Sequence, residues 1–341
     1  MRAAARAAAR PGGSPGARQT VTASLSSVPF TDGGRPAPAK KPSLLRRIYK
    51  HRADYLYVLP AISVMLLVIA YPIYDTIYLS FLNLPPNLAF EEAAFTGFDN
   101  YARILQAESF HEATWNTVVW TVFSTFIAFV LGFGAALALN GAFLGQGLLR
   151  GILLVPYVIS AVAAAYIWRW IFHSDFGVIG AITVGLGLTE RPINFLDSTS
   201  SVMASLIVVN VWKEFPFAMI MMLAGLQTVP DQLLRAAKVD GASAWNRFWH
   251  VTVPHVRHVA VVTILLLLVA NLNGFTIPYV MTGGGPAGAS EIWITHIYQI
   301  AFGRIRFGLA SAYSVILFII MMVLGYFYVR ALTRGDERTP S

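Results

Sequence analysis

The segment PDQLLRAAKVDGASAWNRFWHVTVPHVR, residues Pro230–Arg257, decides the fold, because it is a polar, helix-forming stretch between two long apolar runs. Pro230 suits the first turn of a helix, where its missing N–H costs nothing, and most of residues 232–239 favour a helix. Asp240 and Gly241 should end this helix, since glycine readily takes the left-handed conformation that closes one. The first half of the segment therefore predicts a short helix followed by a sharp corner.

The second half of the segment predicts another short helix with an aromatic face. Ser243 offers a side-chain oxygen that can cap the N-terminus of this helix. Three aromatic residues then follow at helical spacing and share one side: Trp245, Phe248 and Trp249. Pro254 should stop the helix, because proline has no N–H to donate. We expect the whole segment to protrude from the apolar body of the protein.

The composition of the chain is that of an integral membrane protein. Of 341 residues, 56% are hydrophobic and 12% are charged, whereas about a quarter of the residues of a soluble domain are charged. Six apolar stretches are long enough to cross roughly 30 Å of hydrocarbon as helices. They are Tyr55–Leu82, Thr117–Leu139, Leu148–Phe172, Val202–Leu226, Ala260–Met281 and Leu309–Leu332. We therefore predict an all-α membrane protein with six transmembrane helices, in which residues 229–257 link helices 4 and 5.

The transmembrane domain should occupy residues 54–334, between two tails. Residues 1–53 lack the apolar residues that would offset the entropy of ordering, so we expect a disordered basic tail. An Arg-rich, acid-poor start also resembles an organelle transit peptide, but a bacterial cytoplasmic tail fits as well and needs no cleavage. The first apolar stretch is too long for the core of a cleaved signal peptide, so it should remain as an anchor. Residues 335–341 form a short second tail.

The formal net charge of +8 is distributed by side of the membrane. Eleven Lys and Arg precede the first apolar stretch, the 229–257 segment and the C-terminal end carry seven more, and the alternate loops carry nine carboxylates. Because cytoplasmic loops collect Lys and Arg, both termini and the 229–257 segment should be cytoplasmic. This distribution argues against nucleic acid as a partner and for membrane lipid.

Cysteine and histidine exclude two kinds of chemistry. The chain has no cysteine, so disulfides, thiolate metal sites and cysteine nucleophiles are excluded. None of the seven histidines builds a zinc motif, because no suitable partner stands at the required spacing. We therefore predict no metal site.

The order of residues in the 229–257 segment resembles the signature loop of the transmembrane subunits of ATP-binding-cassette (ABC) importers, E-A-A-x-x-D-G-A followed by a Phe and a Pro. The matching residues are Ala236, Ala237, Asp240, Gly241, Ala242, Phe248 and Pro254. Arg235 departs from the pattern, because the family usually has Glu there. Several other stretches are similar to the sugar-permease branch of this family, including residues 96–101, 168–170 and 282–286. The resemblance covers most of residues 55–334.

This resemblance implies a type I ABC importer permease fold, in which the loop between helices 4 and 5 is a coupling helix that docks into a cytoplasmic ATPase. It implies a subunit in the bacterial cytoplasmic membrane that translocates a carbohydrate, such as an oligosaccharide, a disaccharide or a glycerol-3-phosphate-like solute. The implied partners are a second homologous permease, a dimer of ABC ATPases and an extracytoplasmic solute-binding protein. The chain has no G-x-x-x-x-G-K-[ST] motif. We therefore predict a non-catalytic subunit without a bound cofactor, with ATP used by its partner.

Polar residues inside the apolar stretches mark a candidate substrate path. Two adjacent charges lie near mid-membrane in the fourth stretch, where charge is costly; they should face the bundle interior or a water-filled cavity, or form a structural ion pair with another span. Polar residues also interrupt the fifth stretch, where a helix can open toward a cavity. A sugar needs amide or carboxylate hydrogen bonds and an aromatic ring against its C–H faces. The candidates are Tyr157, Asn210, Lys213, Glu214, Asn271, Asn273 and Phe275.

Two other functions stay open at this point. A permease of the same architecture could import amino acids, peptides or polyamines. A secondary transporter driven by an ion gradient would suit the intramembrane charges Lys213 and Glu214, but it gives the signature loop no role. The sequence does not name the solute, and it does not assign the substrate to this chain or to a second permease.

Overall fold

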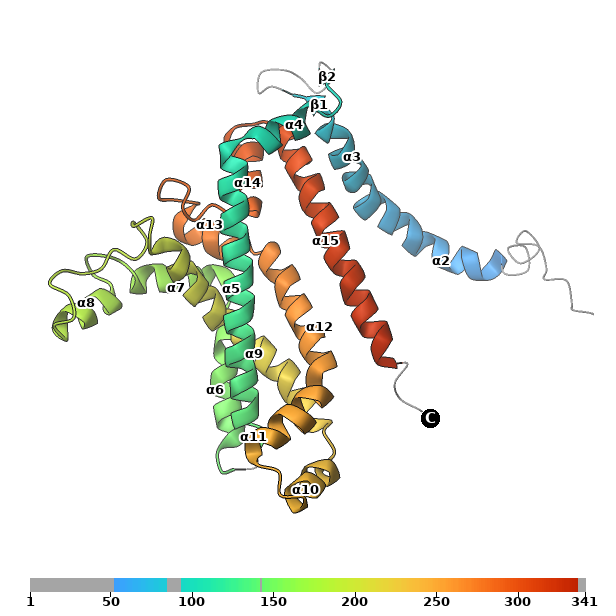
Figure 1. The fold of residues 1–341 in the computed structure, drawn as a ribbon. Helices are drawn as coiled ribbons and strands as arrows, with labels where there is room; N and C mark the ends of the chain where they lie inside the picture. Colours follow the sequence, from blue (N-terminus) through green and yellow to red (C-terminus); the bar gives the residue numbers. More distant parts are fainter. Residues whose placement is uncertain (1–51, 85–92, 142, 337–341) are drawn as a thin grey trace, which may run out of the picture. The chain divides into compact units, whose positions relative to one another are not determined.

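The computed structural model describes residues 52–84, 93–141 and 143–336, and these are mostly helical (Figure 1). The predicted tail at residues 1–53 lies outside the described residues except for its last two, which begin α2 (Arg52–Met65). The predicted second tail, residues 335–341, also lies mostly outside the described residues, which end with α15 (Phe307–Asp336). The chain divides into two compact units, Met1–Ala61 and Ile62–Ser341, and the packing between helices is described for the second unit.

The first apolar stretch is helical from Tyr57 to Ser80. It consists of α2, a five-residue π turn called η1 (Leu66–Ala70) and α3 (Tyr71–Ser80). Pro72 is the second residue of α3, so only Tyr71 separates it from the π turn. A π turn shifts the backbone hydrogen bonds to the i→i−5 pattern. The helix can therefore continue past a residue that has no N–H to donate.

The centre of the second unit is the contact between α5 (Glu108–Ala138) and α9 (Val202–Gln227), which pack along much of their length (Figure 1). The buried side of α5 carries small residues about one turn apart: Thr117, Thr121, Ser124, Ala128, Gly132 and Ala136. A Cβ on Gly132 would lie 2.5 Å from Cβ of Ala218 and 2.6 Å from the carbonyl oxygen of Phe215. Small residues allow such close approach of helices in a membrane, where packing replaces the hydrophobic effect.

The remaining long helices pack around this pair. The helix α12 (Val253–Leu272) contacts both α5 and α9, and it also contacts α15, which in turn packs against α3. A two-stranded antiparallel sheet follows α3 and consists of β1 (Leu82–Asn83) and β2 (Ala94–Phe95). Both β1 and the amphipathic helix α4 (Asp99–Gln106) contact α15. The side-chain amide of Asn100 donates to the carbonyls of Ser80 and Leu82, at 2.9 Å each. These bonds fasten α4 to the end of α3.

Five helices of the described residues are long and apolar enough to cross a membrane, and a sixth span exists when one bent pair is counted as a single crossing. That pair corrects the predicted straight span at residues 148–172. The helix α6 (Gln146–Val158) and the helix α7 (Ala161–Ile171) meet at an angle of 93°. The two residues between them, Ile159 and Ser160, have extended ψ angles of 136° and 138°.

The predicted interruption of the fifth apolar stretch is confirmed. The helix α12 ends at Leu272, and α13 (Thr276–Thr282) begins after the break. The described chain also contains three shorter elements: α8 (Val178–Gly185), α14 (Trp293–Tyr298) and the π turn η4 (Gln299–Gly303). The segments α13 and α7 pack against each other, so the helices that follow the two breaks are in contact.

Candidate functional site

The corner predicted between helices 4 and 5 has the expected geometry. The helix α10 (Asp231–Val239) ends before Gly241, which has a φ of +79° in the left-handed region that favours glycine. Ser243 caps α11 (Ala244–Arg247), because its Oγ accepts a hydrogen bond of 3.2 Å from the backbone N–H of Asn246. Arg247 Nη1 donates to the carbonyl oxygen of Ala242 at 2.7 Å and closes the corner. Pro230 is the N-cap residue of α10, one position earlier than predicted.

The prediction that Pro254 stops the second helix is wrong. The helix α11 continues into a π turn, η3 (Phe248–Thr252), and then directly into α12 (Figure 1). The N–H of Val253 bonds to the carbonyl of Phe248 five residues earlier, so the π turn accommodates the proline as η1 does before Pro72. The aromatic helix is therefore the end of a membrane span.

The three predicted aromatic residues do form one cluster. The ring centroids of Trp245, Phe248 and Trp249 lie 5.2–6.2 Å apart. Phe248 also stacks on Phe133 of α5 at 5.9 Å, which fixes the cluster to the bundle. Trp245 and Trp249 remain 68% and 48% exposed. We call the exposed face of α10, the corner and these two tryptophans the loop surface.

The other signature residues lie on or beside the loop surface. Ala236, Asp240 and Pro254 are exposed, and Ala237 and Ala242 are half-buried. Arg235 is also exposed, and within residues 143–336 its side chain makes no hydrogen bond or salt bridge. The loop surface is therefore an accessible aromatic and basic face.

A buried amide pair joins α9 to the last turn of α12. Asn210 Nδ2 donates to Oδ1 of Asn271 at 2.6 Å, and Asn271 Nδ2 donates to Thr125 Oγ1 at 3.0 Å. The indole N–H of Trp120 donates to the carbonyl oxygen of Asn271 at 3.0 Å. Asn210 and Asn271 are 5% and 1% exposed. The structure thus brings two of the predicted path residues into direct contact and ties both to α5.

Glu214 lies beside this amide pair, near the side chains of Asn271 and Asn210. Its Oε2 is buried and has no hydrogen-bond partner among the residues that the structure describes. Thr121 Oγ1, one turn from Thr125 on α5, is also buried and has no hydrogen-bond partner among the described residues. A buried polar atom without a partner is costly. The site therefore retains hydrogen-bonding capacity that a polar solute or water can use.

Lys213 and Glu214 point to different neighbours, although they are adjacent in sequence. Lys213 Nζ donates to the carbonyl oxygen of Ile159 at 2.8 Å and to that of Tyr157 at 3.4 Å. It also lies 6.0 Å from the centroid of the Tyr157 ring. Within the described chain, no salt bridge joins either charge to another span. Among the described residues, Lys213 and Glu214 therefore do not form the structural ion pair with another span that the sequence left open.

Asn273 and Phe275 lie apart from the amide pair. Asn273 is exposed, and its Nδ2 donates to the carbonyl oxygen of Val269 at 3.1 Å. Phe275 stacks on Tyr279 at 4.6 Å and on Tyr298 at 5.1 Å. Six of the seven predicted path residues therefore fall into three groups: an amide and carboxylate cluster, a lysine with Tyr157, and an aromatic stack that contains Phe275. Asn273 belongs to none of them.

The aromatic stack borders a groove of about 560 Å³ that the sequence analysis did not identify. Its polar and aromatic lining comes from α7, α13, α14 and η4 and comprises Tyr166, Arg169, Tyr279, Tyr298 and Gln299. Arg169 Nη1 donates to the carbonyl oxygen of Val280 at 3.4 Å. Part of this groove had a sequence signal, because Arg169 lies in the 168–170 stretch, and Thr282 and Gly283 in the 282–286 stretch, that resemble the sugar-permease branch. The other residues come from elements whose meeting depends on both helix breaks.

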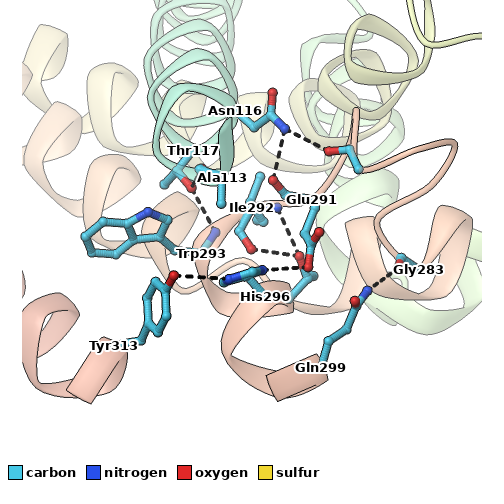
Figure 2. A network of polar contacts seen from close by, with 12 residues as sticks. Ala113, Asn116, Thr117, Gly283, Glu291, Ile292, Trp293, His296, Gln299 and Tyr313 are labelled. Atoms are coloured by element: carbon cyan, nitrogen blue, oxygen red, sulfur yellow. Dashed lines mark hydrogen bonds and ion pairs between the residues drawn. The ribbon is translucent and has the colours of Figure 1, made fainter. Parts of the chain in front are cut away.

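The loop after α13, residues 283–292, is more firmly bonded than a flexible glycine turn (Figure 2). Gln299 Nε2 donates to the carbonyl oxygen of Gly283 at 2.7 Å, and Asn116 Nδ2 donates to the carbonyl oxygen of Glu291 at 3.1 Å. His296 Nδ1 lies 2.8 Å from Glu291 Oε1, and its Nε2 lies 3.3 Å from the Tyr313 hydroxyl. These contacts fix one wall of the groove to α5, α14 and α15. The described residues contain no group of three potential metal ligands.

The fold and these sites define a class of protein: a multi-pass helical subunit with broken spans, buried polar groups and a protruding loop, which is the architecture of a transport protein. Residues 128–335 match the family described as binding-protein-dependent transport system inner membrane component. The chain belongs to this family of membrane transport components.

Relatives match over nearly their whole length. The chain is 34% identical over 283 residues to the trehalose/maltose transport system permease protein MalF of Thermococcus litoralis, covering 82% of this chain and 93% of the relative. It is 34% identical over 281 residues to the sulfoquinovosyl glycerol transport system permease protein SmoG of Agrobacterium fabrum, covering 82% and 90%. It is 30% identical over 289 residues to the diacetylchitobiose uptake system permease protein DasB of Streptomyces coelicolor, covering 84% and 88%.

The fold is also that of a solved ABC importer. The crystal structure of a bacterial alginate ABC transporter, in complex with an alginate pentasaccharide-bound periplasmic protein, contains a chain that matches with a TM-score of 0.72. The match covers 87% of this chain and 99% of that chain at 23% sequence identity. The predicted type I ABC importer permease fold is confirmed.

Proposed function

We propose that this chain is a permease subunit of an ATP-driven ABC importer that translocates a carbohydrate, such as an oligosaccharide, a disaccharide or a glycerol-3-phosphate-like solute. Three relatives that match over most of their length are named for trehalose/maltose, sulfoquinovosyl glycerol and diacetylchitobiose. All three named solutes carry sugar rings. Their names support a carbohydrate over an amino acid, a peptide or a polyamine.

The observation that carries this proposal is the groove beside the aromatic stack. Tyr279 and Tyr298 lie with ring centroids 4.8 Å apart, and Tyr166 on α7 is 56% exposed. Aromatic rings suit the C–H faces of a sugar, and the Gln299 amide and Arg169 guanidinium supply hydrogen-bond donors. The amide and carboxylate cluster around Asn271 offers a second set of polar groups closer to the centre of α9. These two sites form our candidate substrate path through this subunit.

The proposed partners are those of a binding-protein-dependent importer. The loop surface, with Arg235, Ala236, Asp240 and Gly241, docks on a cytoplasmic dimer of ABC ATPases. A second homologous permease completes the path, and an extracytoplasmic solute-binding protein delivers the solute. ATP is hydrolysed on the ATPase subunits, because this chain has no phosphate-binding loop motif. Exposed tryptophans next to basic residues are the composition of a protein interface, which supports this role for the loop surface.

We further propose the orientation that the charge distribution predicts. Both termini and the loop surface face the cytoplasm of a bacterium, and the loop at residues 283–292 faces outward. In this orientation the loop surface is on the side that holds ATP. The basic residues 1–53 then form a cytoplasmic tail, and residues 54–334 form the membrane domain.

Uptake measurements test the proposal. Cells that express the complete transporter are given radiolabelled trehalose, diacetylchitobiose or glycerol-3-phosphate, with unlabelled sugars, amino acids, peptides and polyamines as competitors. We expect competition by sugars, and loss of uptake when ATP is depleted while the proton gradient is clamped. Uptake that survives ATP depletion would instead indicate a secondary transporter, and competition by polyamines or amino acids alone would reassign the substrate.

A matched pair of variants tests the groove. Tyr298→Ala removes an aromatic ring from the groove, whereas Tyr71→Ala removes a ring that is 64% exposed on α3, away from it. We expect weaker uptake with Tyr298→Ala and unchanged uptake with Tyr71→Ala, at equal amounts of protein in the membrane. Equal uptake in both variants would contradict the assignment of the groove to the substrate path.

A further inference from the structure

The break between α6 and α7 creates a specific problem of hydrogen bonding. The carbonyls in the last turn of a helix have no donor within that helix. At membrane depth water does not supply one, so other groups of the protein must. Here the next helix cannot provide the donors, because α7 leaves α6 at 93°.

Lys213 on α9 provides these donors from 54 residues away in the sequence. Its Nζ donates to the carbonyl oxygen of Ile159, within the break, at 2.8 Å. It also donates to the carbonyl oxygen of Tyr157, in the last turn of α6, at 3.4 Å. A lysine ammonium has three N–H donors and no acceptor, so it matches a group of carbonyls. It also carries the charge that the C-terminal end of a helix attracts.

A second contact from α9 reaches the same place. Phe217, one turn after Lys213, stacks on the ring of Tyr157 with centroids 6.0 Å apart and an interplanar angle of 24°. Lys213 Nζ lies 6.0 Å from the centroid of the same ring. One face of α9 therefore holds the end of α6 by both its backbone and its side chain. The neighbouring Glu214 faces the amide pair instead.

The contact between Lys213 and the break joins α9, which leads to the loop surface, to the start of α7, which lines the groove. The helix α9 ends at Gln227, three residues before α10 and the loop surface begin. The helix α7 carries Tyr166 and Arg169, which line the groove. The Lys213 contact therefore lies between the element that leads to the loop surface and the element that forms one wall of the groove.

We propose that Lys213 is a positioning residue that fastens the break between α6 and α7 to α9, so that movement of α9 carries the α7 wall of the groove with it. This inference rests on the proposed function, because it takes the loop surface as the place where ATP-driven movement enters. It assigns the intramembrane lysine to backbone carbonyls of its own chain. Direct contact with the solute is not required of it.

Distance measurements between two spin labels test this inference without any solute. The chain has no cysteine, so Val162→Cys in the first turn of α7 and Ala224→Cys near the end of α9 can be labelled selectively. Both side chains are exposed. In the complete transporter in lipid, we expect one narrow distance distribution, the same without nucleotide and after trapping with ATP and vanadate. Lys213→Met keeps the length of the side chain but removes the donors, and it should give a second population at longer distance.

Two further variants separate the proposal from general loss of packing. Lys213→Arg restores N–H donors and should return the narrow distribution, whereas Glu214→Gln alters the adjacent residue and should leave it unchanged. A narrow distribution in Lys213→Met, or broadening in Lys213→Arg equal to that in Lys213→Met, would overturn the inference. Failure of the proposed function would appear separately, as absence of a bound ATPase, because the nucleotide-free distances do not depend on it.

Discussion

The side-chain amide of Asn210 on α9 and that of Asn271 on α12 share a hydrogen bond of 2.6 Å in the interior of the helix bundle. The helix α9 leads down to α10, and α12 is the continuation of α11. Both helices that emerge at the loop surface are therefore joined to each other by an amide pair inside the bundle. Thr125 and Trp120 extend the connection to α5.

A double-mutant cycle on this pair should show coupling. Replacing either amide by leucine leaves the other buried amide without its partner, and replacing both removes the unpaired group. We expect a coupling free energy of about 1 kcal/mol, since hydrogen bonds between membrane helices are worth little more than this. Reversible unfolding in mixed micelles measures it. Asn273→Leu is the control, because Asn273 is exposed; if it couples to Asn210→Leu equally, the pair is not a specific contact.

Gly132 should be intolerant of any side chain. A Cβ at this position would overlap Ala218 across the contact between α5 and α9, so the helices would have to separate. We expect Gly132→Ala to lower the free energy of unfolding by about 1–3 kcal/mol, the usual cost of overpacking. Gly134→Ala is the matched control two residues away, where nothing lies within 4 Å of the added Cβ. Equal stability of the two variants would show that this contact is not close-packed.

The corner at Gly241 should matter for coupling and hardly for folding. A β-branched residue at its φ of +79° is strained, by about 1–2 kcal/mol, although no atom lies within 4 Å of the added Cβ. We expect Gly241→Val to insert normally but to lose uptake and binding-protein-stimulated ATP hydrolysis. Gly145→Val is the control with the same kind of strain, because Gly145 has a φ of +84° and equal space in the loop before α6. If both variants transport equally, the corner does not aim a docking surface.

Arg235 should reveal how the proposed ATPase partner meets a charge opposite in sign to that of the signature Glu. Its exposed guanidinium stands where relatives of the signature pattern have Glu, so a cleft built for Glu would repel it. If the cleft offers a carboxylate instead, Arg235→Glu should weaken ATPase association more than Arg235→Ala does. Co-purification of the complex at several salt concentrations measures this. Unchanged assembly with Arg235→Glu would mean that this side chain faces solvent in the complex.

The orientation can be tested with single cysteines, because an introduced thiol is the only one in the chain. Asn246→Cys on the loop surface and Thr199→Cys before α9 are both at exposed positions. In intact cells, a membrane-impermeant maleimide should label Thr199→Cys and should label Asn246→Cys only after the cells are opened. The reverse pattern would invert the topology and remove the loop surface from the ATPase side.

Local features were predictable from the sequence, and features made by distant contacts were not. The corner at Gly241 and the cap at Ser243 depend on the conformational preferences of single residues, so the structure confirms them. The break at Ile159 depends on a donor that lies on another helix, and the passage of α11 through Pro254 depends on a π turn. Neither arrangement leaves a mark on hydrophobic periodicity, which is why a straight span and a helix stop were predicted there.

The candidate site divides in the same way. Asn210, Glu214 and Asn271 were predictable because polar residues in an apolar stretch are conspicuous, although their mutual contact was not. The groove was missed because Tyr298 and Tyr166 reach Tyr279 only after both broken spans have folded. Aromatic residues are common in membrane helices, so their presence alone did not indicate a binding surface.

The helical run from α11 through η3 to α12 is uninterrupted, so it fixes the directions of its side chains around the helix axis relative to one another. Trp249 on the loop surface and Asn271 near the other end of this run lie on one helix, so their directions around the axis are set by the number of residues between them. One inserted residue would rotate the tryptophan face by about 100° relative to the amide, whereas the same insertion in a loop would be absorbed. The number of residues in this stretch therefore cannot change by even one without turning the tryptophan face, including at positions whose side chains touch only lipid.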